Sequence, residues 1–225
     1  MKLTAEKITK EYPRLRAGSN YFTAVQPVDF ALEAGRVTEI TGRSGSGKST
    51  LLNMLAGLLT PTAGRVLLDD TDLYALPDGQ LSRLRNRHIG VVPQGQTALQ
   101  SLTVLENVLL PAQLYGDGKA ALPRARHLLE QMGIASLADV RPKELSGGEL
   151  RRMAIARALI NGPAVLLADE PTGDLDDENT AAVLGLLRDT ARQGAAVLLV
   201  THEAEAARYA DEIWHMEAGA PTRWE

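Results

Sequence analysis

The nine residues from Gly42 to Thr50 constrain this chain more than any other stretch. They read GRSGSGKST and satisfy the pattern G-x-x-x-x-G-K-[ST], after the strand candidate VTEIT (37–41) and before the helix candidate LLNMLAGLL (51–59). In such a loop, backbone N–H groups cradle phosphates, the lysine neutralises their charge and the hydroxyl coordinates Mg²⁺. A chance match is expected in only about one chain in a hundred of this size. We therefore expect residues 42–50 to bind the phosphates of a nucleotide.

The rest of the chain alternates between strand and helix candidates, which favours an α/β fold with a mainly parallel sheet. Strands are expected at RVLLD (65–69), IGVVP (89–93), AVLLADE (164–170) and AAVLLVT (195–201), and helices within 103–132, from LSGGE to about Ile160, and near 177–193. The first forty residues read as short strands broken by turns at 12–13, 17–20 and 34–35. Residues 95–160 interrupt the alternation, so we expect a helical subdomain there, within a single domain spanning 1–225.

Composition narrows the function classes. Of the 225 residues, 44% are hydrophobic and 23% are charged, which is ordinary for a globular domain with a sizeable core. The formal net charge of −4 gives no support for a nucleic-acid partner. The absence of cysteine excludes disulfides, cysteine catalysis and thiolate metal sites, and it suits a reducing cytosol. No signal-peptide pattern and no run of eighteen apolar residues is present, so we expect any membrane role to come through a partner chain.

Two acidic residues end the buried strand candidate AVLLADE. Open α/β sheets bind their ligands at this end of their strands, where Asp169 can hold Mg²⁺ and Glu170 can orient or deprotonate a water molecule. Alone, such a pair is more often a helix cap or a solvated edge. Beside the 42–50 loop, metal and water chemistry becomes the favoured interpretation. A P-loop kinase would not need Glu170 as a base, so this residue indicates hydrolysis.

Two further polar residues follow strand candidates. His202 comes after AAVLLVT and could contact a terminal phosphate and the attacking water, although a lone histidine is more often a surface or capping residue. Gln94 comes after IGVVP and offers an amide oxygen to Mg²⁺ or water, but a glutamine in isolation is a weak signal.

A second glycine-rich helix start occurs at LSGGE (145–149). Ser146, Gly147 and Gly148 fit an ordinary N-cap with flexible glycines, and they equally fit an anion-binding helix start. The helix that follows has apolar residues at helical spacing. Its three arginines are expected to face solvent or nearby carboxylates; they are Arg151, Arg152 and Arg157.

Taken together, these motifs resemble those of an ABC-transporter ATPase subunit. The stretches GRSGSGKST, VVPQ, LSGGE, AVLLADE, TGDLD and TH resemble Walker A, the Q-loop, the ABC signature, Walker B, the D-loop and the switch histidine, in that order. The resemblance covers essentially the whole chain. It implies a P-loop NTPase fold with a mainly parallel core sheet, an N-terminal antiparallel β subdomain and an inserted helical subdomain.

The resemblance also implies a role for each matching residue. ATP phosphates would be bound by Gly42, Arg43, Ser44, Gly45, Ser46, Gly47, Lys48, Ser49 and Thr50. Mg²⁺ would be ligated by Ser49 and Gln94 and supported by Asp169. Glu170 would be the catalytic base, His202 would sense the γ-phosphate, and Lys48 would complete the catalytic set. Tyr12 would stack on adenine, a role that Tyr21 or Phe22 could take instead.

In the same family, two ATPase subunits share their sites. Ser146, Gly147 and Gly148 would close over ATP held by the partner's 42–50 loop, and Asp176 would connect the two sites. The resemblance thus implies a homodimer at the cytoplasmic face of the cell membrane, bound to an integral permease. The stretches LRNRHIGVVPQ and LLADEPTGDLD resemble the branch for macrolide efflux, lipoprotein release, antimicrobial-peptide resistance and haem export, which favours export.

Three positions depart from the family pattern. Leu150 stands where glutamine is usual, Asp174 replaces a common asparagine, and Glu39 brings a charge into a strand that is usually apolar.

Other functions remain as alternatives. A cell-division-type ATPase would act as a nucleotide-dependent clamp. A DNA-repair or chromosome ATPase would carry long coiled coils between the P-loop and the signature, where this chain has only about a hundred residues without sustained heptads. A translation-associated ATPase normally has two cassettes in one chain, and this chain has one.

Overall fold

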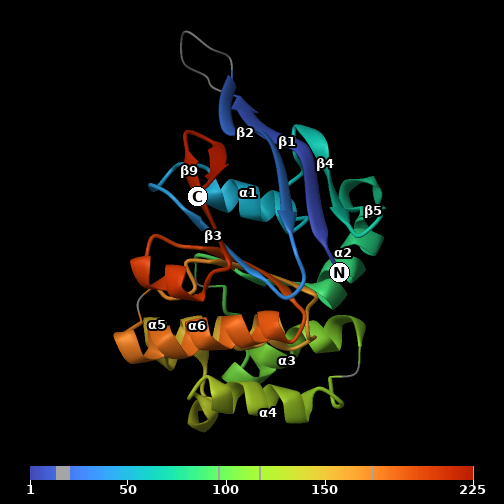
Figure 1. Ribbon diagram of the computed structural model, residues 1–225. Coiled ribbons are helices and arrows are strands. Elements are labelled where there is room, and N and C mark those ends of the chain that lie inside the picture. The colour runs from blue at the N-terminus through green and yellow to red at the C-terminus, as the bar shows by residue number, and fades with distance from the viewer. Residues whose placement is uncertain (14–20, 96, 117, 174, 225) are drawn as a thin grey trace.

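The computed structural model describes residues 1–13, 21–95, 97–116, 118–173 and 175–224. Two sheets organise this part of the chain (Figure 1). The first is antiparallel, with the order β2 (Tyr21–Leu32), β1 (Leu3–Pro13), β4 (Ala63–Leu68) and β5 (Thr71–Asp72). The second has the order β10 (Ala220–Arg223), β9 (Glu212–Glu217), β3 (Val37–Thr41), β8 (Ala196–Val200), β7 (Val165–Asp169) and β6 (Ile89–Val92). Every neighbouring pair in the second sheet is parallel except β9 and β10, which confirms the mainly parallel sheet.

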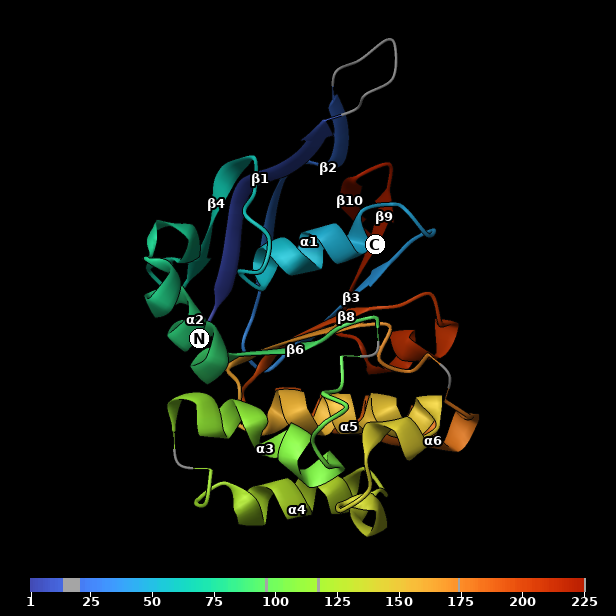
Figure 2. The ribbon, with the colours of Figure 1, turned by 180° about the vertical axis from the view of Figure 1, so that it is seen from behind.

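Helices fill the space between the sheets and cover the far face of the larger one (Figures 1 and 2). Helix α1 (Lys48–Leu55) lies between the two sheets, and α2 (Asp78–His88) lies beside the N-terminal end of β6. The far face carries α3 (Val104–Tyr115), α4 (Leu122–Gln131), α5 (Gly147–Leu159) and α6 (Asp177–Arg192). Short 3₁₀ helices are η1 (Leu73–Ala75), η2 (Ala135–Leu137), η3 (Pro142–Glu144) and η4 (Ala204–Tyr209).

Each face of the larger sheet has its own hydrophobic core. Alternate residues of a strand point to opposite faces, so Val165 and Leu167 pack with α1 and the antiparallel sheet, while Leu166 and Ala168 pack with α3 to α6. Both faces of β7 and β8 are buried, which explains their continuous apolar sequences. Because both strands are packed on both faces, their carboxyl ends are held in place. Asp169 is the last residue of β7, and Thr201 directly follows β8.

The first forty residues differ from the sequence prediction. The first two strands are long, and Tyr12 and Pro13, where a break was expected, are the last residues of β1. The turn expected at 34–35 is confirmed and separates β2 from β3. Residues 17–20 lie outside the described residues. The antiparallel sheet also takes in β4 and β5 from residues 63–72, which no local pattern assigns to the same sheet.

The observed ends of other helices and strands also differ from the predicted ones. The helix after the phosphate loop ends at Leu55 and does not reach residue 59, because Gly57 adopts a left-handed backbone with φ of 68°. Helix α2 was missed because its sequence is mostly polar and buries only Leu81 among its residues, so it has no apolar stripe. The remaining predicted strands and helices are confirmed, with ends shifted by a few residues.

Within the described residues, no helix has both the length and the apolar character needed to cross a membrane.

Candidate active site

Residues 42–47 form a tight loop between β3 and α1. Three glycines have positive φ angles: 145° at Gly42, 79° at Gly45 and 104° at Gly47. A Cβ at Gly47 would come within 2.2 Å of the Ala24 carbonyl oxygen, and one at Gly42 would come within 2.3 Å of the Met216 oxygen. The loop therefore needs glycine for its backbone angles and for its close approach to β2 and β9.

Lys48 begins α1, and its ammonium lies within the same loop. The Nζ atom donates to the Gly42 oxygen at 2.7 Å and to the Arg43 oxygen at 2.9 Å. The side chain is buried. A buried cation held by neutral carbonyl and hydroxyl oxygens is a strong electrostatic partner for an incoming phosphate.

A cavity of about 780 Å³ brings most of the predicted site residues together. Its lining includes Tyr12, Gly42, Arg43, Ser44, Gly45, Gly47, Lys48, Ser49, Thr50, Gln94, Asp169, Glu170 and His202. Sequence reasoning missed Ala24, Arg151 and Gly173, which also line it. Ser46 does not line the cavity; it is buried under the loop, where its carbonyl accepts from the Gly219 N–H at 3.0 Å.

Asp169 and Glu170 lie side by side at the carboxyl end of β7 but have different surroundings. Asp169 is buried, and burial raises the pKa of its carboxyl, while a hydrogen bond from Ser49 opposes that rise. The backbone turns sharply at Glu170, which has φ of 50°, a conformation that costs a non-glycine residue about 1 to 3 kcal/mol. This turn lets consecutive carboxylates face the same cavity.

Glu170 and His202 form the polar pair on the far side of the cavity. The Glu170 Oε1 atom lies 2.9 Å from His202 Nδ1, and this hydrogen bond, together with the negative charge of Glu170, raises the pKa of His202. The Glu170 side chain is 13% exposed and the histidine side chain is 73% exposed. The other carboxylate oxygen, Oε2, is buried and has no hydrogen-bond partner among the described residues. An acceptor in this position can orient and deprotonate a water molecule.

The cavity also offers a donor set that suits Mg²⁺. A hydroxyl from Ser49, an amide oxygen from Gln94 and a carboxylate from Asp169 all line it, and Mg²⁺ prefers such hard oxygen ligands. Glu170 lines the same space. Among the described residues, no group of three or more histidine, cysteine, aspartate and glutamate side chains is placed to hold a metal ion.

Aromatic side chains lie at the opposite end of the cavity from the carboxylates. Tyr12 on β1 and Phe22 on β2 are partners in the antiparallel ladder, and both line the cavity. Lys10 places its ammonium 5.5 Å from the centre of the Tyr12 ring. Tyr21 is the next residue along β2 but does not line the cavity. Of the three aromatic candidates, Tyr12 and Phe22 are therefore positioned to stack on a planar base.

The Ser146 stretch lies outside this cavity. Ser146 is the N-cap of α5, and it forms a capping box in which its hydroxyl accepts from the Glu149 N–H while the Glu149 carboxylate accepts from the Ser146 N–H at 2.7 Å. Ser146 and Gly147 are exposed. Neither they nor Gly148 lines the cavity around the phosphate loop. The N-cap interpretation is correct for the isolated chain, and it leaves open what the exposed helix start binds.

Asp176 also lies outside the cavity. It is the N-cap of α6, where its carboxylate accepts from the Asn179 N–H at 2.8 Å. Among the departures from the family pattern, Leu150 is buried in the core between the helices, and Asp174 lies outside the described residues.

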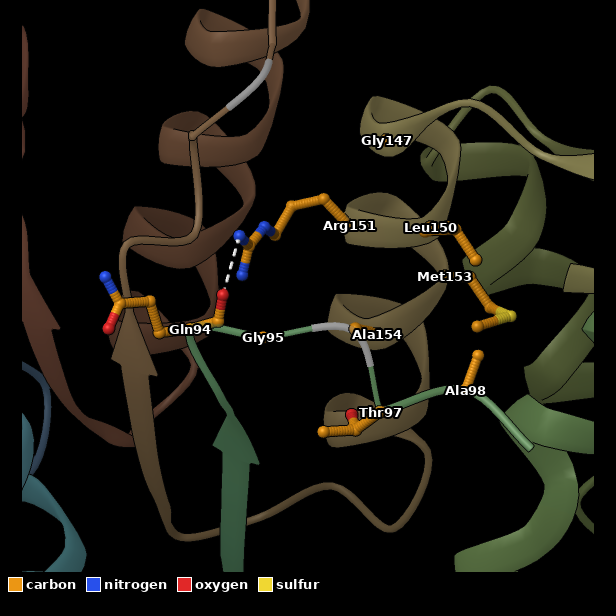
Figure 3. Close-up of a pocket in the computed structure, with 9 residues that line it drawn as sticks. All are labelled: Gln94, Gly95, Thr97, Ala98, Gly147, Leu150, Arg151, Met153 and Ala154. Atoms are coloured by element: carbon orange, nitrogen blue, oxygen red, sulfur yellow. Dashed lines mark hydrogen bonds between the residues drawn. The ribbon is translucent and has the colours of Figure 1, made fainter. Parts of the chain in front are cut away.

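The prediction that the arginines of α5 face solvent or nearby carboxylates was wrong for Arg157 and incomplete for Arg151. It is confirmed for Arg152: hydrogen bonds lower the pKa of the nearby Glu149 and Asp176 carboxyls, and the charge of Arg152 lowers it further. Arg151 reaches back to the segment after β6 and donates to the Pro93 oxygen at 2.8 Å and the Gln94 oxygen at 3.2 Å (Figure 3). Arg157 donates to the carbonyl and hydroxyl of Thr97 in the same segment. Arg152 donates to the side chain of Asn179, at the start of α6. The helix after LSGGE is thus tied directly to the segment that carries Gln94.

The strand–loop–helix of residues 37–55, the carboxylates at the end of the neighbouring β7 and the mainly parallel sheet define a P-loop nucleoside triphosphatase. Comparisons with known proteins identify the family. Residues 25–173 match the family described as ABC transporter. The chain is 40% identical to the lipoprotein-releasing system ATP-binding protein LolD of Xanthomonas campestris pv. campestris (strain 8004), over 96% of this chain and 90% of the relative. This chain belongs to the ABC transporter family, and it is the ATP-binding, ATP-hydrolysing part of such a transporter.

Other relatives are longer than this chain. It is 42% identical to the methionine import ATP-binding protein MetN of Bradyrhizobium diazoefficiens and spans 62% of that protein's length. It is 38% identical to the macrolide export ATP-binding/permease protein MacB of Shewanella sp. (strain W3-18-1) and spans 32% of it. Among solved structures, the ATP-binding cassette MJ0796, in a dimeric post-hydrolysis state bound to ADP and Pi, matches with a TM-score of 0.90 and 33% identity over 99% of both chains.

Proposed function

We propose that this chain energises a separate membrane permease from the cytoplasmic face of the membrane, as one of two identical ATPase subunits, and that the transporter exports or releases its cargo. The observation that carries this proposal is the position of the Ser146 helix start. It is exposed, capped and rich in glycine, yet it lies outside the cavity that contains the phosphate loop of the same chain. An anion-binding helix start of this kind is free to bind the nucleotide of a second subunit.

In the proposed dimer, ATP lies between the 42–50 loop of one subunit and the Ser146–Gly148 helix start of the other. The N–H groups at the start of α5 and the positive end of its dipole face the γ-phosphate. MJ0796, the similar solved structure, is described as dimeric, which supports this arrangement. Asp176, exposed at the N-terminus of α6, lies at the contact between the two sites.

Hydrolysis then uses the residues at the end of β7 and β8. Glu170 accepts a proton from the attacking water, whose oxygen bonds to the γ-phosphorus while the bond to the ADP oxygen breaks, and His202 holds the Glu170 Oε1 atom in place through its 2.9 Å hydrogen bond. Lys48 neutralises charge on the β- and γ-phosphates. Mg²⁺ would be held by Ser49, Gln94 and Asp169, and it would neutralise charge that develops on the phosphates. At the far end of the cavity, Tyr12 or Phe22 stacks on the adenine.

Contacts between α5 and the Gln94 segment suggest how the two sites communicate. Arg151 and Arg157 join the helix that begins at Ser146 to residues 93–97. Movement of α5 on dimer closure would therefore move Gln94 and alter its contact with the magnesium ion.

The relatives support transport and favour export. LolD is named for lipoprotein release and aligns over nearly its whole length, and MacB is named for macrolide export. MetN is named for methionine import and is similarly identical, so the direction of transport needs a direct test. All of these relatives are transport proteins, which favours transport over a cell-division clamp.

The dimer can be tested with two helix caps that have the same chemistry. Ser146→Arg should leave ATP binding to the monomer intact but reduce hydrolysis at least a hundredfold, because the new side chain blocks the closing surface. Thr103→Arg is the matched control, since Thr103 forms the same capping box with Glu106 at the start of α3. Each variant loses one helix N-cap, which should lower the free energy of unfolding by about 1 kcal/mol in both. The two variants should therefore be equally stable and differ only in ATPase activity. Equal activities in the two variants would refute the proposed closing role of Ser146.

The permease can be identified by purification from membranes. A tagged Glu170→Gln chain with ATP should form a stable dimer that stays bound to its permease, because general-base loss slows hydrolysis by about 10² to 10⁴-fold. A co-purified permease that releases lipoprotein or drug-like cargo after reconstitution supports export. A permease that accumulates methionine or another nutrient would show that the direction proposed here is wrong.

A further inference from the structure

A second cavity, of about 860 Å³, is lined by residues of β3, η4 and β9, by Gly42 and Arg43 of the phosphate loop and by Trp224. Its volume is in the range of sites that hold small organic molecules. Gly42, Arg43 and His202 line both this cavity and the nucleotide cavity. The proposed hydrolysis mechanism uses none of the other residues that line it.

Glu39 is the unusual residue of this cavity. It stands in the middle of β3 and is 1% exposed, and its Oε2 atom has no hydrogen-bond partner among the described residues. Burial raises the pKa of Glu39 to about 7. A buried carboxyl without a donor costs free energy, so a ligand that supplies a donor would gain by binding there.

The other carboxylates among the described lining residues already have donors. Glu203 accepts from a threonine hydroxyl at 2.6 Å, Asp211 accepts from an arginine and a backbone N–H, and Glu212 accepts from an indole N–H and an arginine. Among the described carboxylates that line this cavity, Glu39 is therefore the one with a buried oxygen that has no hydrogen-bond donor.

Part of the cavity wall is apolar, while the rest carries charged side chains that include Arg43 and Arg223. Methyl groups of Ala204 and Ala207 on η4 and the side chain of Ile213 on β9 line it. Trp224 also lines the cavity; the residue is 63% exposed, and its ring packs edge-on against His215 with ring centres 5.9 Å apart. An exposed indole and an unpaired carboxyl oxygen that line one cavity can together recognise an organic cation, through cation–π attraction and charge-assisted hydrogen bonding.

We propose that this cavity binds a small organic cation with an apolar body, whose ammonium group donates to Glu39 and whose apolar part lies against η4 and Trp224. Because Arg43 and His202 line both cavities, the cation and the nucleotide alter each other's affinity. By linkage, that effect must be equal in both directions.

The test uses the full chain and two probes of one shape, 2-phenylethylammonium and 2-phenylethanol, with binding measured by isothermal titration calorimetry. The ammonium should bind at least tenfold more tightly than the neutral alcohol. Glu39→Gln should remove that preference, whereas Glu212→Gln should change the affinity less than threefold because its carboxyl is already paired. Equal binding of the two probes, or equal losses in the two variants, would overturn the proposal.

Two further measurements guard against misfolding and test the coupling. Ala207→Phe fills the cavity without changing its charge and should abolish binding of the ammonium, while circular dichroism checks that each variant is folded. Binding that persists in this variant would place the cation elsewhere and overturn the site. Saturating MgADP should change the dissociation constant of the ammonium about fivefold or more, and an unchanged value would overturn the coupling. Neither result depends on the proposed permease or on the direction of transport.

Discussion

Arg157 connects α5 to the segment after β6, and its replacement tests whether that connection stabilises the domain. Its guanidinium is half-buried, and burial lowers its pKa, so its hydrogen bonds to Thr97 are partly shielded from water. Hydrogen bonds from a charged donor contribute about 1.5 to 3 kcal/mol each. Thr97 is exposed, and water can replace the lost donor there, so each of the two bonds is expected to contribute only about 1 kcal/mol, as an ordinary hydrogen bond does. We expect Arg157→Met, which keeps most of the apolar stem, to cost about 2 kcal/mol in total.

For a chain of this length, 2 kcal/mol corresponds to a decrease in Tm of roughly 4 to 8 °C. Arg192→Met is the control, because Arg192 forms only an exposed ion pair with Asp189 within α6, and such pairs contribute about 0.5 kcal/mol or less. Thermal and urea unfolding followed by circular dichroism give both values. Hydrogen exchange should also become faster at residues 97–99 in Arg157→Met alone. If the two variants unfold together, the contacts of Arg157 do not stabilise the domain and the reasoning is wrong.

Three other outcomes follow from the structure. Asn107→Leu should cost about 2 to 4 kcal/mol in urea unfolding, because the buried amide bonds to main-chain groups of residues 99–103 and its loss would take away the acceptor of the Leu99 N–H and the amide donor of the Leu102 carbonyl. Gly47→Ala should abolish ATP binding in equilibrium dialysis, because the new methyl group would overlap a carbonyl of β2. By NMR titration, the midpoint of His202 should lie above that of His88, whose pKa burial lowers, and it should fall in Glu170→Gln. Since the folded-state pKa of His202 is raised, its contribution to stability is complete below about pH 6.5 and is lost as the pH rises through the raised value.

Local patterns were sufficient to predict most of the fold. Burial on both faces requires the continuous apolar sequences of β7 and β8, and the backbone angles of the phosphate loop require its glycine spacing, so both features can be recognised from a local sequence pattern. Helix α2 has no such pattern, because it buries one leucine and is mostly polar. No local sequence pattern predicts the pairing of β1 with β4 either, since it joins residues about sixty positions apart through backbone hydrogen bonds.

The candidate site divides in the same way. Sequence reasoning named Lys48, Asp169, Glu170 and His202, and the structure brings all four into one cavity. It could not predict the partners of Arg151, because a helical arginine reads as a solvated residue whether it faces water or the carbonyls of a distant segment.

The phosphate loop, the mainly parallel sheet and the chemistry available at the strand ends can be recognised from local sequence, because each depends on neighbouring residues. The packed fold was needed to show that the Ser146 helix start lies outside its own chain's nucleotide cavity, and that the Glu39 Oε2 atom is buried with no donor among the described residues. Both facts depend on which distant segments approach one another, and that is decided by the packing of the two cores on either side of the larger sheet.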